Sequence, residues 1–213
     1  MRAKYLLFVL CFSTSLFSDY KFETVLSGLD DAWSLEFLSE DEIIYTEMPG
    51  KLKIANLIDG SITQIKNTPK VQYSSQGGLS EVVLDPDFAS NNMIYLSYSA
   101  RNSDGKSTLY LMSAVLNEDS LENKKVIFEA KAPRRVPVHL GAKIAFLNDG
   151  TILLASGDGF DHREKAQTLD NHFGKIIRIN KDGTVPSDNP FINEENALPD
   201  IYSYGHRNQQ GLI

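Results

Sequence analysis

The amino-acid sequence predicts an all-β fold, and more narrowly a β-propeller of which about three blades are present. Helical signals are scarce, because no segment keeps apolar residues at the i, i+3, i+4, i+7 spacing over three turns. Short β-rich runs bounded by Gly, Asp, Asn and Pro recur throughout the chain instead. These predicted strands are residues 42–45, 51–55, 93–98, 108–116, 151–155 and 175–179.

The strand runs also form a repeat. Residues 34–44 and 143–153 share one pattern, a strand, an acidic turn and a second strand, and both continue into a Gly-Lys strand and an Asp-Gly turn. A looser copy lies between them. The repeat starts near Leu35, Leu79, Ile144 and Leu212, which gives units of 44, 65 and 68 residues. Such units hold four strands and a loop, the spacing of propeller blades with insertions. A β-sandwich, the competing architecture, needs no such internal repeat.

The first 18 residues have the layout of a secretory signal peptide, because Arg2 and Lys4 precede an apolar run. We therefore expect the remaining domain, residues 19–213, to be periplasmic or secreted, with no membrane attachment after cleavage. The single cysteine, Cys11, lies in the signal peptide, so the mature chain has no thiol, as suits an oxidising compartment. Loss of the two cations takes the formal charge from −7 to −9, and so acidic a chain is a poor ligand for nucleic acid.

The C-terminal segment, 203–213, carries a dense polar cluster and then stops. His206, Arg207 and Asn208 lie between two glycines, and residues 211–213 read like the opening of a further strand. We interpret the sequence as a truncated protein. Three blades would leave two apolar faces without neighbours, so we expect the 213-residue chain alone to be inactive.

Eight short motifs follow one another along the chain, at residues 76–79, 85–88, 139–141, 156–159, 172–180, 182–183, 188–191 and 205–208. In this order they resemble the soluble pyrroloquinoline quinone (PQQ)-dependent aldose dehydrogenases, the glucose/sorbosone dehydrogenase family. The resemblance runs from about Trp33 to the last residue. It implies a six-bladed propeller with the quinone across the mouth of the central tunnel, of which this chain is the N-terminal half. It also implies a calcium ion whose ligands lie beyond the end of this chain.

The implied reaction oxidises the anomeric C1-OH of an aldose to a lactone. It needs a base for the hydroxyl proton and an acceptor for the hydride, and no side chain accepts a hydride, so a cofactor is obligatory. We predict His139 as the base, because imidazole titrates near neutral pH and the loop 137–141 precedes the third repeat unit. A lone histidine is more often an ordinary surface or capping residue. The resemblance to the family's catalytic base favours the catalytic interpretation.

Asp158 lies in a Gly-Asp-Gly turn, where an aspartate commonly bonds its own backbone. The resemblance implies instead that Asp158 supports His139. It also implies that Gln76, Arg207 and Asn208 contact the quinone. A guanidinium and two amides offer planar, multidentate donors to a ligand that carries several carboxylates and two carbonyls.

Other polar residues are given structural roles. We interpret His162 and Arg163 as solvated surface residues, His172 as part of a structural turn, and His206 as serving a strand end. No metal ligand is predicted within this chain, since its acidic turns do not have the spacing of an EF-hand loop.

Two function classes remain open. The first is a quinone-dependent sugar dehydrogenase with a small-molecule sugar substrate and an external electron acceptor. The second is a non-catalytic propeller of the same superfamily that binds a glycan or a protein partner. The presence of Gln76, His139, Arg207 and Asn208 together favours the enzyme, because a binding module does not need this set of residue types.

Overall fold

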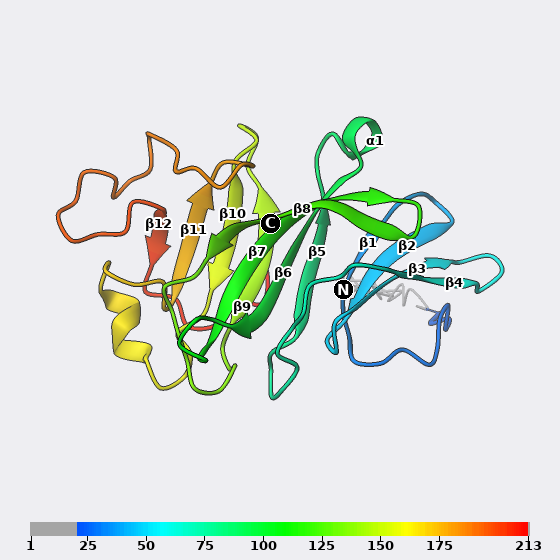
Figure 1. The fold of residues 1–213 in the computed structure, drawn as a ribbon, viewed down its shortest axis with the longest axis horizontal. Coiled ribbons are helices and arrows are strands. Elements are labelled where there is room, and N and C mark those ends of the chain that lie inside the picture. The colour runs from blue at the N-terminus through cyan, green and yellow to red at the C-terminus, as the bar shows by residue number, and fades with distance from the viewer. Residues whose placement is uncertain (1–20, 213) are drawn as a thin grey trace, which may run out of the picture.

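The computed structural model describes residues 21–212, and the predicted signal peptide, 1–18, lies outside them. Three twisted antiparallel sheets of four strands lie side by side (Figure 1). Their strand orders are β1-β2-β3-β4, β5-β6-β7-β8 and β9-β10-β11-β12, so each sheet is a meander of consecutive strands. This is the structure of propeller blades, and it confirms the predicted all-β fold with three blades.

The strands of each blade are short and follow one another closely. Blade 1 contains β1 (Ala32–Phe37), β2 (Glu42–Glu47), β3 (Lys51–Asn56) and β4 (Ile62–Ile65). Blade 2 contains β5 (Leu79–Leu84), β6 (Met93–Arg101), β7 (Ser107–Asn117) and β8 (Ser120–Glu129). Blade 3 contains β9 (Gly141–Phe146), β10 (Ile152–Ser156), β11 (Lys175–Ile179) and β12 (Ile201–Tyr204). The helical elements described are α1 (Phe88–Asn91) and a 3-10 helix, η1 (Arg163–Gln167). Among residues 21–212, no helix is long and apolar enough to cross a membrane.

All six predicted runs are strands, and their ends differ from the observed ones by at most three residues. The first strand of each blade, β1, β5 or β9, was predicted only as part of the repeat, and the outermost strand, β4, β8 or β12, was not predicted. An outermost strand pairs along one edge only, so much of its surface faces water and its apolar alternation is weak. In β8, for example, the five consecutive residues 122–126 are all exposed.

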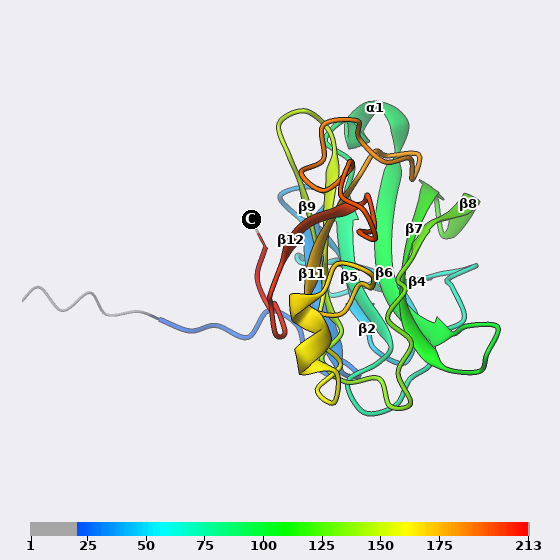
Figure 2. The same cartoon turned by 90° about the vertical axis from the view of Figure 1, so that its left-hand side faces the viewer.

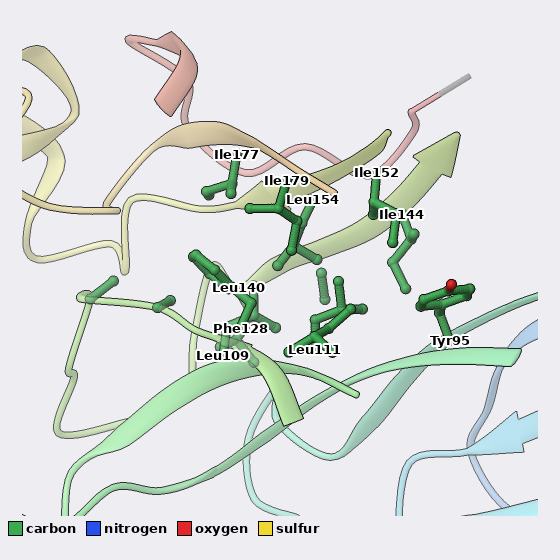
Figure 3. Close-up of a cluster of buried hydrophobic side chains, with 14 of the residues drawn as sticks. Tyr95, Leu109, Leu111, Phe128, Leu140, Ile144, Ile152, Leu154, Ile177 and Ile179 are labelled. Atoms are coloured by element: carbon green, nitrogen blue, oxygen red, sulfur yellow. The ribbon is translucent and has the colours of Figure 1, made fainter. Parts of the chain in front are cut away.

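The core lies between the blades. One large apolar cluster joins blade 1 to blade 2, and another joins blade 2 to blade 3. Figure 3 shows the second cluster, in which Leu109 and Leu111 of β7 face side chains of β10 and β11. Successive side chains of a strand point to opposite faces, so Ile152 and Leu154 of β10 point toward blade 2 while Leu153 points away.

The outer faces of blades 1 and 3 carry much smaller apolar clusters. On blade 1, Ile43, Tyr45 and Ala55 pack with Leu26 and Leu57. On blade 3, Leu153, Ala155 and Ile176 pack with Leu147 and Leu212. The chain before β1 and after β12 thus covers part of faces that we expected to be bare, although Trp33, Leu35 and Phe37 of β1 remain exposed. Gly211 and Leu212 form no strand, and Ile213 lies outside the described residues.

Candidate active site

Two loops of the chain meet beside blade 3. One loop connects β8 to β9 and carries His139, and the other follows β10 and carries Asp158. His139 has a positive φ of 46°, which is uncommon for a residue other than glycine. The ring Nδ1 lies 2.8 Å from Asp158 Oδ1. The structure therefore brings together the predicted base and its predicted partner.

The two loops touch through their backbones at Gly157. A Cβ atom at this position would lie 2.0 Å from the carbonyl oxygen of His139 and 3.1 Å from that of Arg207. Only glycine allows so close an approach. The Gly157 N–H donates to the carbonyl of Leu140 at 3.0 Å, so the contact is also hydrogen-bonded.

The Asp158 carboxylate is buried and held from several sides. Its Oδ1 accepts from the Phe160 N–H at 2.8 Å, which is the turn interaction expected from sequence, as well as from the imidazole. The Asp158 N–H donates to the Arg207 carbonyl at 2.7 Å. A carboxylate acceptor at Nδ1 fixes the proton of a neutral imidazole on that nitrogen. The Nε2 atom of His139 then has a free lone pair and can accept a proton.

Gln76 and Asn208 hold the His139 loop through their side-chain oxygens. The His139 N–H donates to Gln76 Oε1 at 2.8 Å, and the Gly141 N–H donates to Asn208 Oδ1 at 3.1 Å. A backbone N–H can only donate, so the contacting amide atoms must be the oxygens. Within residues 21–212 the two amide NH2 groups have no protein acceptor, and they can therefore donate to a bound carbonyl or carboxylate.

Two cavities adjoin this pair of loops. The first has a volume of about 300 Å³ and is lined by Asp158, Phe160 and Arg207 together with residues of η1. The second, of about 380 Å³, lies where the first strands of the three blades converge, with Gln76 and Asn208 in its wall. Four of the five predicted site residues therefore line these two cavities, and the fifth, His139, contacts Asp158. Within the described chain the exposed Arg207 guanidinium has no carboxylate partner, so it remains able to bind an anion.

The first cavity is closed on one side by η1, which lies beside β12 and the segment that follows it (Figure 2). Arg163 is exposed, as expected from sequence, but its guanidinium lies 5.6 Å from the Phe160 ring centre and lines the cavity. His162 differs from the solvated residue that we expected, because it is half-buried against Phe173, and this burial lowers its pKa.

The remaining histidines have structural contacts. His172 is buried, with Nδ1 accepting from the Lys131 N–H at 2.8 Å and Nε2 lying 2.9 Å from Asp200 Oδ1. His206 Nε2 lies 2.8 Å from Ser203 Oγ at the end of β12. Both arrangements agree with the structural roles expected from sequence. Burial, followed by the nearby Lys175 charge, lowers the pKa of His206.

Sequence reasoning missed Phe160 and Arg134. The Phe160 ring packs edge-on against the His139 imidazole, with 5.2 Å between ring centres, and its backbone has a positive φ of 64°. Arg134 is buried beneath both loops. Neither residue carries a sequence signal, since an Arg-Arg pair in a loop reads as solvated surface. Among residues 21–212, no three His, Cys, Asp or Glu side chains are grouped so that they could hold a metal ion.

Comparison with known protein families matches residues 29–213 to the family described as Glucose / Sorbosone dehydrogenase. The chain is 33% identical over 210 residues to the Aldose sugar dehydrogenase YliI of Escherichia coli strain K12. That alignment covers 96% of this chain and 56% of the relative. The chain thus spans about half the length of the curated relatives that it matches.

Solved structures of dehydrogenases share the fold of this chain. A crystal structure of a glucose dehydrogenase superposes with a TM-score of 0.83 at 36% identity, covering 87% of this chain and 55% of that one. The PQQ-bound form of the Aldose Sugar Dehydrogenase from Streptomyces coelicolor superposes with a TM-score of 0.70 at 25% identity, covering 87% of this chain and 54% of that one.

Proposed function

Because the chain belongs to the glucose/sorbosone dehydrogenase family, we propose that the complete protein oxidises the anomeric C1-OH of aldose sugars to lactones. The observation that carries this proposal is the 2.8 Å contact between His139 and Asp158, because Asp158 also lines a cavity. A neutral imidazole with one nitrogen fixed on a carboxylate is an effective general base at the other nitrogen.

In the proposed mechanism, His139 Nε2 takes the proton of the C1-OH as the hydride leaves C1. Asp158 keeps the Nδ1 proton in place and stabilises the imidazolium that forms, since a carboxylate within hydrogen-bond distance favours the charged ring. Phe160 packs against the imidazole and keeps water from one side of it. When bound, the quinone supplies the acceptor for the hydride.

The residues around the His139–Asp158 pair, here called the dyad, suit a flat, anionic quinone. Gln76 and Asn208 each use the amide oxygen on the His139 loop and keep the NH2 group for an acceptor. The Arg207 guanidinium, for which the described chain provides no carboxylate, can form charge-assisted hydrogen bonds with a ligand carboxylate. Gln76, Arg207 and Asn208 would therefore hold PQQ. Further basic residues and the calcium ligands are proposed to lie beyond this chain.

We further propose that the protein is periplasmic or secreted, as its predicted signal peptide indicates, and that an external acceptor reoxidises the quinone. The alternative of a non-catalytic propeller is not favoured. Two relatives that align over most of this chain carry dehydrogenase names, the Aldose sugar dehydrogenase YliI and the Quinoprotein glucose dehydrogenase B of Acinetobacter calcoaceticus. A partner-binding propeller also gives no reason for the imidazole to be fixed on a buried carboxylate.

Two single variants of the complete protein, each loaded with calcium and PQQ, test this proposal. His139→Asn should lower the turnover of aldose with an artificial electron acceptor by about 10²-fold or more, because a general base is lost. The same variant should still bind PQQ, since its backbone N–H can still donate to Gln76. Arg207→Ala should weaken PQQ binding by at least about tenfold, as expected for loss of a charge-assisted hydrogen bond.

Spectroscopic titration with PQQ measures binding independently of turnover. Full activity in His139→Asn would remove His139 from the mechanism. Unchanged PQQ affinity in Arg207→Ala would mean that residues 205–208 only end a strand. Absence of aldose oxidation in the wild-type complete protein under these conditions would contradict the proposed reaction itself.

A further inference from the structure

Arg134 is a buried cation with no carboxylate hydrogen-bonded to it. Its relative exposure is 2%, and among the described residues it is the largest side chain that is almost completely buried. Arginine is rarely buried without an ion-pair partner, because its desolvation costs several kcal/mol. Arg178, the other buried arginine among residues 21–212, has such partners, Asp149 and Asp188. The position of Arg134 therefore calls for a specific reason.

The guanidinium of Arg134 reaches both loops of the candidate active site. Its Nη1 donates to the carbonyl oxygen of His139 at 3.3 Å, and its Nη2 donates to the carbonyl oxygen of Gly157 at 3.4 Å. The first carbonyl belongs to the proposed base, and the second precedes the proposed supporting carboxylate, Asp158. One planar side chain thus bridges the two segments whose separation sets the distance between imidazole and carboxylate.

The backbone of Arg134 is fixed to blade 2. Its N–H donates to the Ser107 carbonyl at 2.8 Å and its carbonyl accepts from the Ser107 N–H at 2.9 Å. Its guanidinium lies 5.4 Å from the centre of the Phe173 ring. A Cβ atom at Gly159 would lie 3.4 Å from Arg134 Nε, so the turn that carries Asp158 fits closely over the side chain. Arg134 therefore connects blade 2 to both site loops.

The charge of Arg134 also acts on the dyad. Burial lowers the pKa of the Arg134 guanidinium to about 10, and the charge of Asp158 partly opposes this, so the group stays protonated at neutral pH. The Nε of Arg134 has no hydrogen-bond partner within residues 21–212. A buried, incompletely bonded cation opposes folding. An apolar side chain of similar length would fill this space without that cost, so packing alone does not explain the residue.

We propose that Arg134 is a positioning residue for the reaction: its guanidinium clamps the carbonyls of residues 139 and 157 from inside the fold and holds the base against its carboxylate. It does not touch the substrate. The clamp rests on the proposed function, in which His139 is the base. The buried positive charge of Arg134 also attracts the Asp158 carboxylate.

Other charged or titratable groups also surround this region and contribute to any pH dependence. They are His162 and Lys165 against the Phe173 ring, Arg163 over Phe160, and Arg207, whose carbonyl accepts from Asp158. None of these groups bridges the two loops from within the fold. Variants of Arg134 therefore separate its effect from theirs, because the other groups remain unchanged.

The test uses Arg134→Met, Arg134→Lys and the control Arg178→Met in the complete protein loaded with calcium and PQQ. Arg134→Met should lower kcat about tenfold or more, because small misplacements of a base are costly, and should leave KM within about threefold. It should also move the acid limb of the kcat/KM profile to higher pH by about half a unit, because removal of a nearby cation eases protonation. Arg134→Lys keeps the positive charge but lacks the planar guanidinium that contacts both carbonyls. It should therefore lower kcat without moving the acid limb of the kcat/KM profile. Arg178→Met should lower Tm and leave the profile in place.

A second measurement does not depend on turnover. Proton NMR should detect the Nδ1 proton of His139, identified by its loss in His139→Asn, and this proton should exchange with water at least about tenfold faster in Arg134→Met than in the wild type. Unchanged exchange together with unchanged kcat in a folded Arg134→Met would overturn the proposal. Unfolding of both Arg134 variants would also overturn it, since Arg134 would then be a structural residue. Faster exchange in a protein that oxidises no aldose would retain the clamp and reject the proposed function.

Discussion

The two ends of β10 carry similar turns with different surroundings. Asp149 and Gly150 precede the strand, and the turn from Gly157 to Gly159 follows it. In both turns an aspartate accepts from the backbone N–H two residues further on, at 2.9 Å for Asp149 and 2.8 Å for Asp158. Local turn chemistry is therefore the same at the two ends.

The tertiary contacts at the two ends differ. No atom lies within 4 Å of a Cβ built at Gly150, whereas a Cβ at Gly157 would overlap the His139 carbonyl. The side chain of Asp149 is 49% exposed, against 4% for Asp158. The first turn lies in solvent and pairs Asp149 with Arg178 of the same blade, whereas the second forms part of the candidate site. A turn motif in this sequence thus indicates local geometry, and its function depends on what packs over it.

The largest difference between the two turns is expected when Gly157 and Gly150 are each replaced by alanine. Gly157→Ala places a methyl group 2.0 Å from the His139 carbonyl, so the loops must separate and the dyad must break. We expect the complete protein to lose activity by about 10²-fold or more and to melt at lower temperature. Gly150→Ala meets no atom and should cost about 1 kcal/mol for its positive φ of 80°. Equal activities of the two variants would contradict the close backbone contact.

A smaller effect is expected from the middle of β10, where neighbouring leucines point to opposite faces. Leu154 is completely buried between blades 2 and 3, so Leu154→Ala should lower the free energy of unfolding by about 3 kcal/mol. Leu153 belongs to the small cluster on the outer face of blade 3. In a complete propeller the next blade covers this face, so Leu153→Ala should cost about as much. Denaturant unfolding of both variants measures this, and a cost below about 1 kcal/mol at Leu153 would mean that no blade packs there.

The fold could be predicted from sequence to the extent that each strand has a buried face. The predicted runs that correspond to β2, β3 and β11 are apolar and bounded by turn residues. The repetition of such runs along the sequence indicated three blades. The outermost strands could not be predicted from the same pattern. In β4 (Ile62–Ile65) three of four residues are exposed, so its strand character comes from pairing with β3 and not from its own alternation.

The candidate site could be predicted only as separate residues. His139 and Asp158 were each singled out by residue type and by resemblance, but their contact depends on the close approach of two loops at Gly157. Arg134 could not be predicted, because its role depends on burial, and burial of a loop arginine leaves no trace in hydrophobic periodicity. Phe160 was missed for a similar reason, since an aromatic residue after a Gly-Asp-Gly turn has no pattern of its own.

The smallest effect is expected at the exposed end of β10 and depends on pH. Hydrogen bonds from Thr151 and the charge of Arg178 lower the pKa of Asp149 from its usual 3.8 to about 2. A carboxyl whose pKa is lower in the folded state stabilises the fold above pH 3.8, and this contribution disappears as the pH falls toward 2. Asp149→Asn removes the ionisable group and keeps an acceptor for the Thr151 N–H. The Tm of the wild-type complete protein should therefore exceed that of Asp149→Asn near pH 6, and the two values should converge between pH 4 and pH 2. A constant difference across that range would show that the Asp149 charge contributes nothing, and that its hydrogen bonds alone hold the turn.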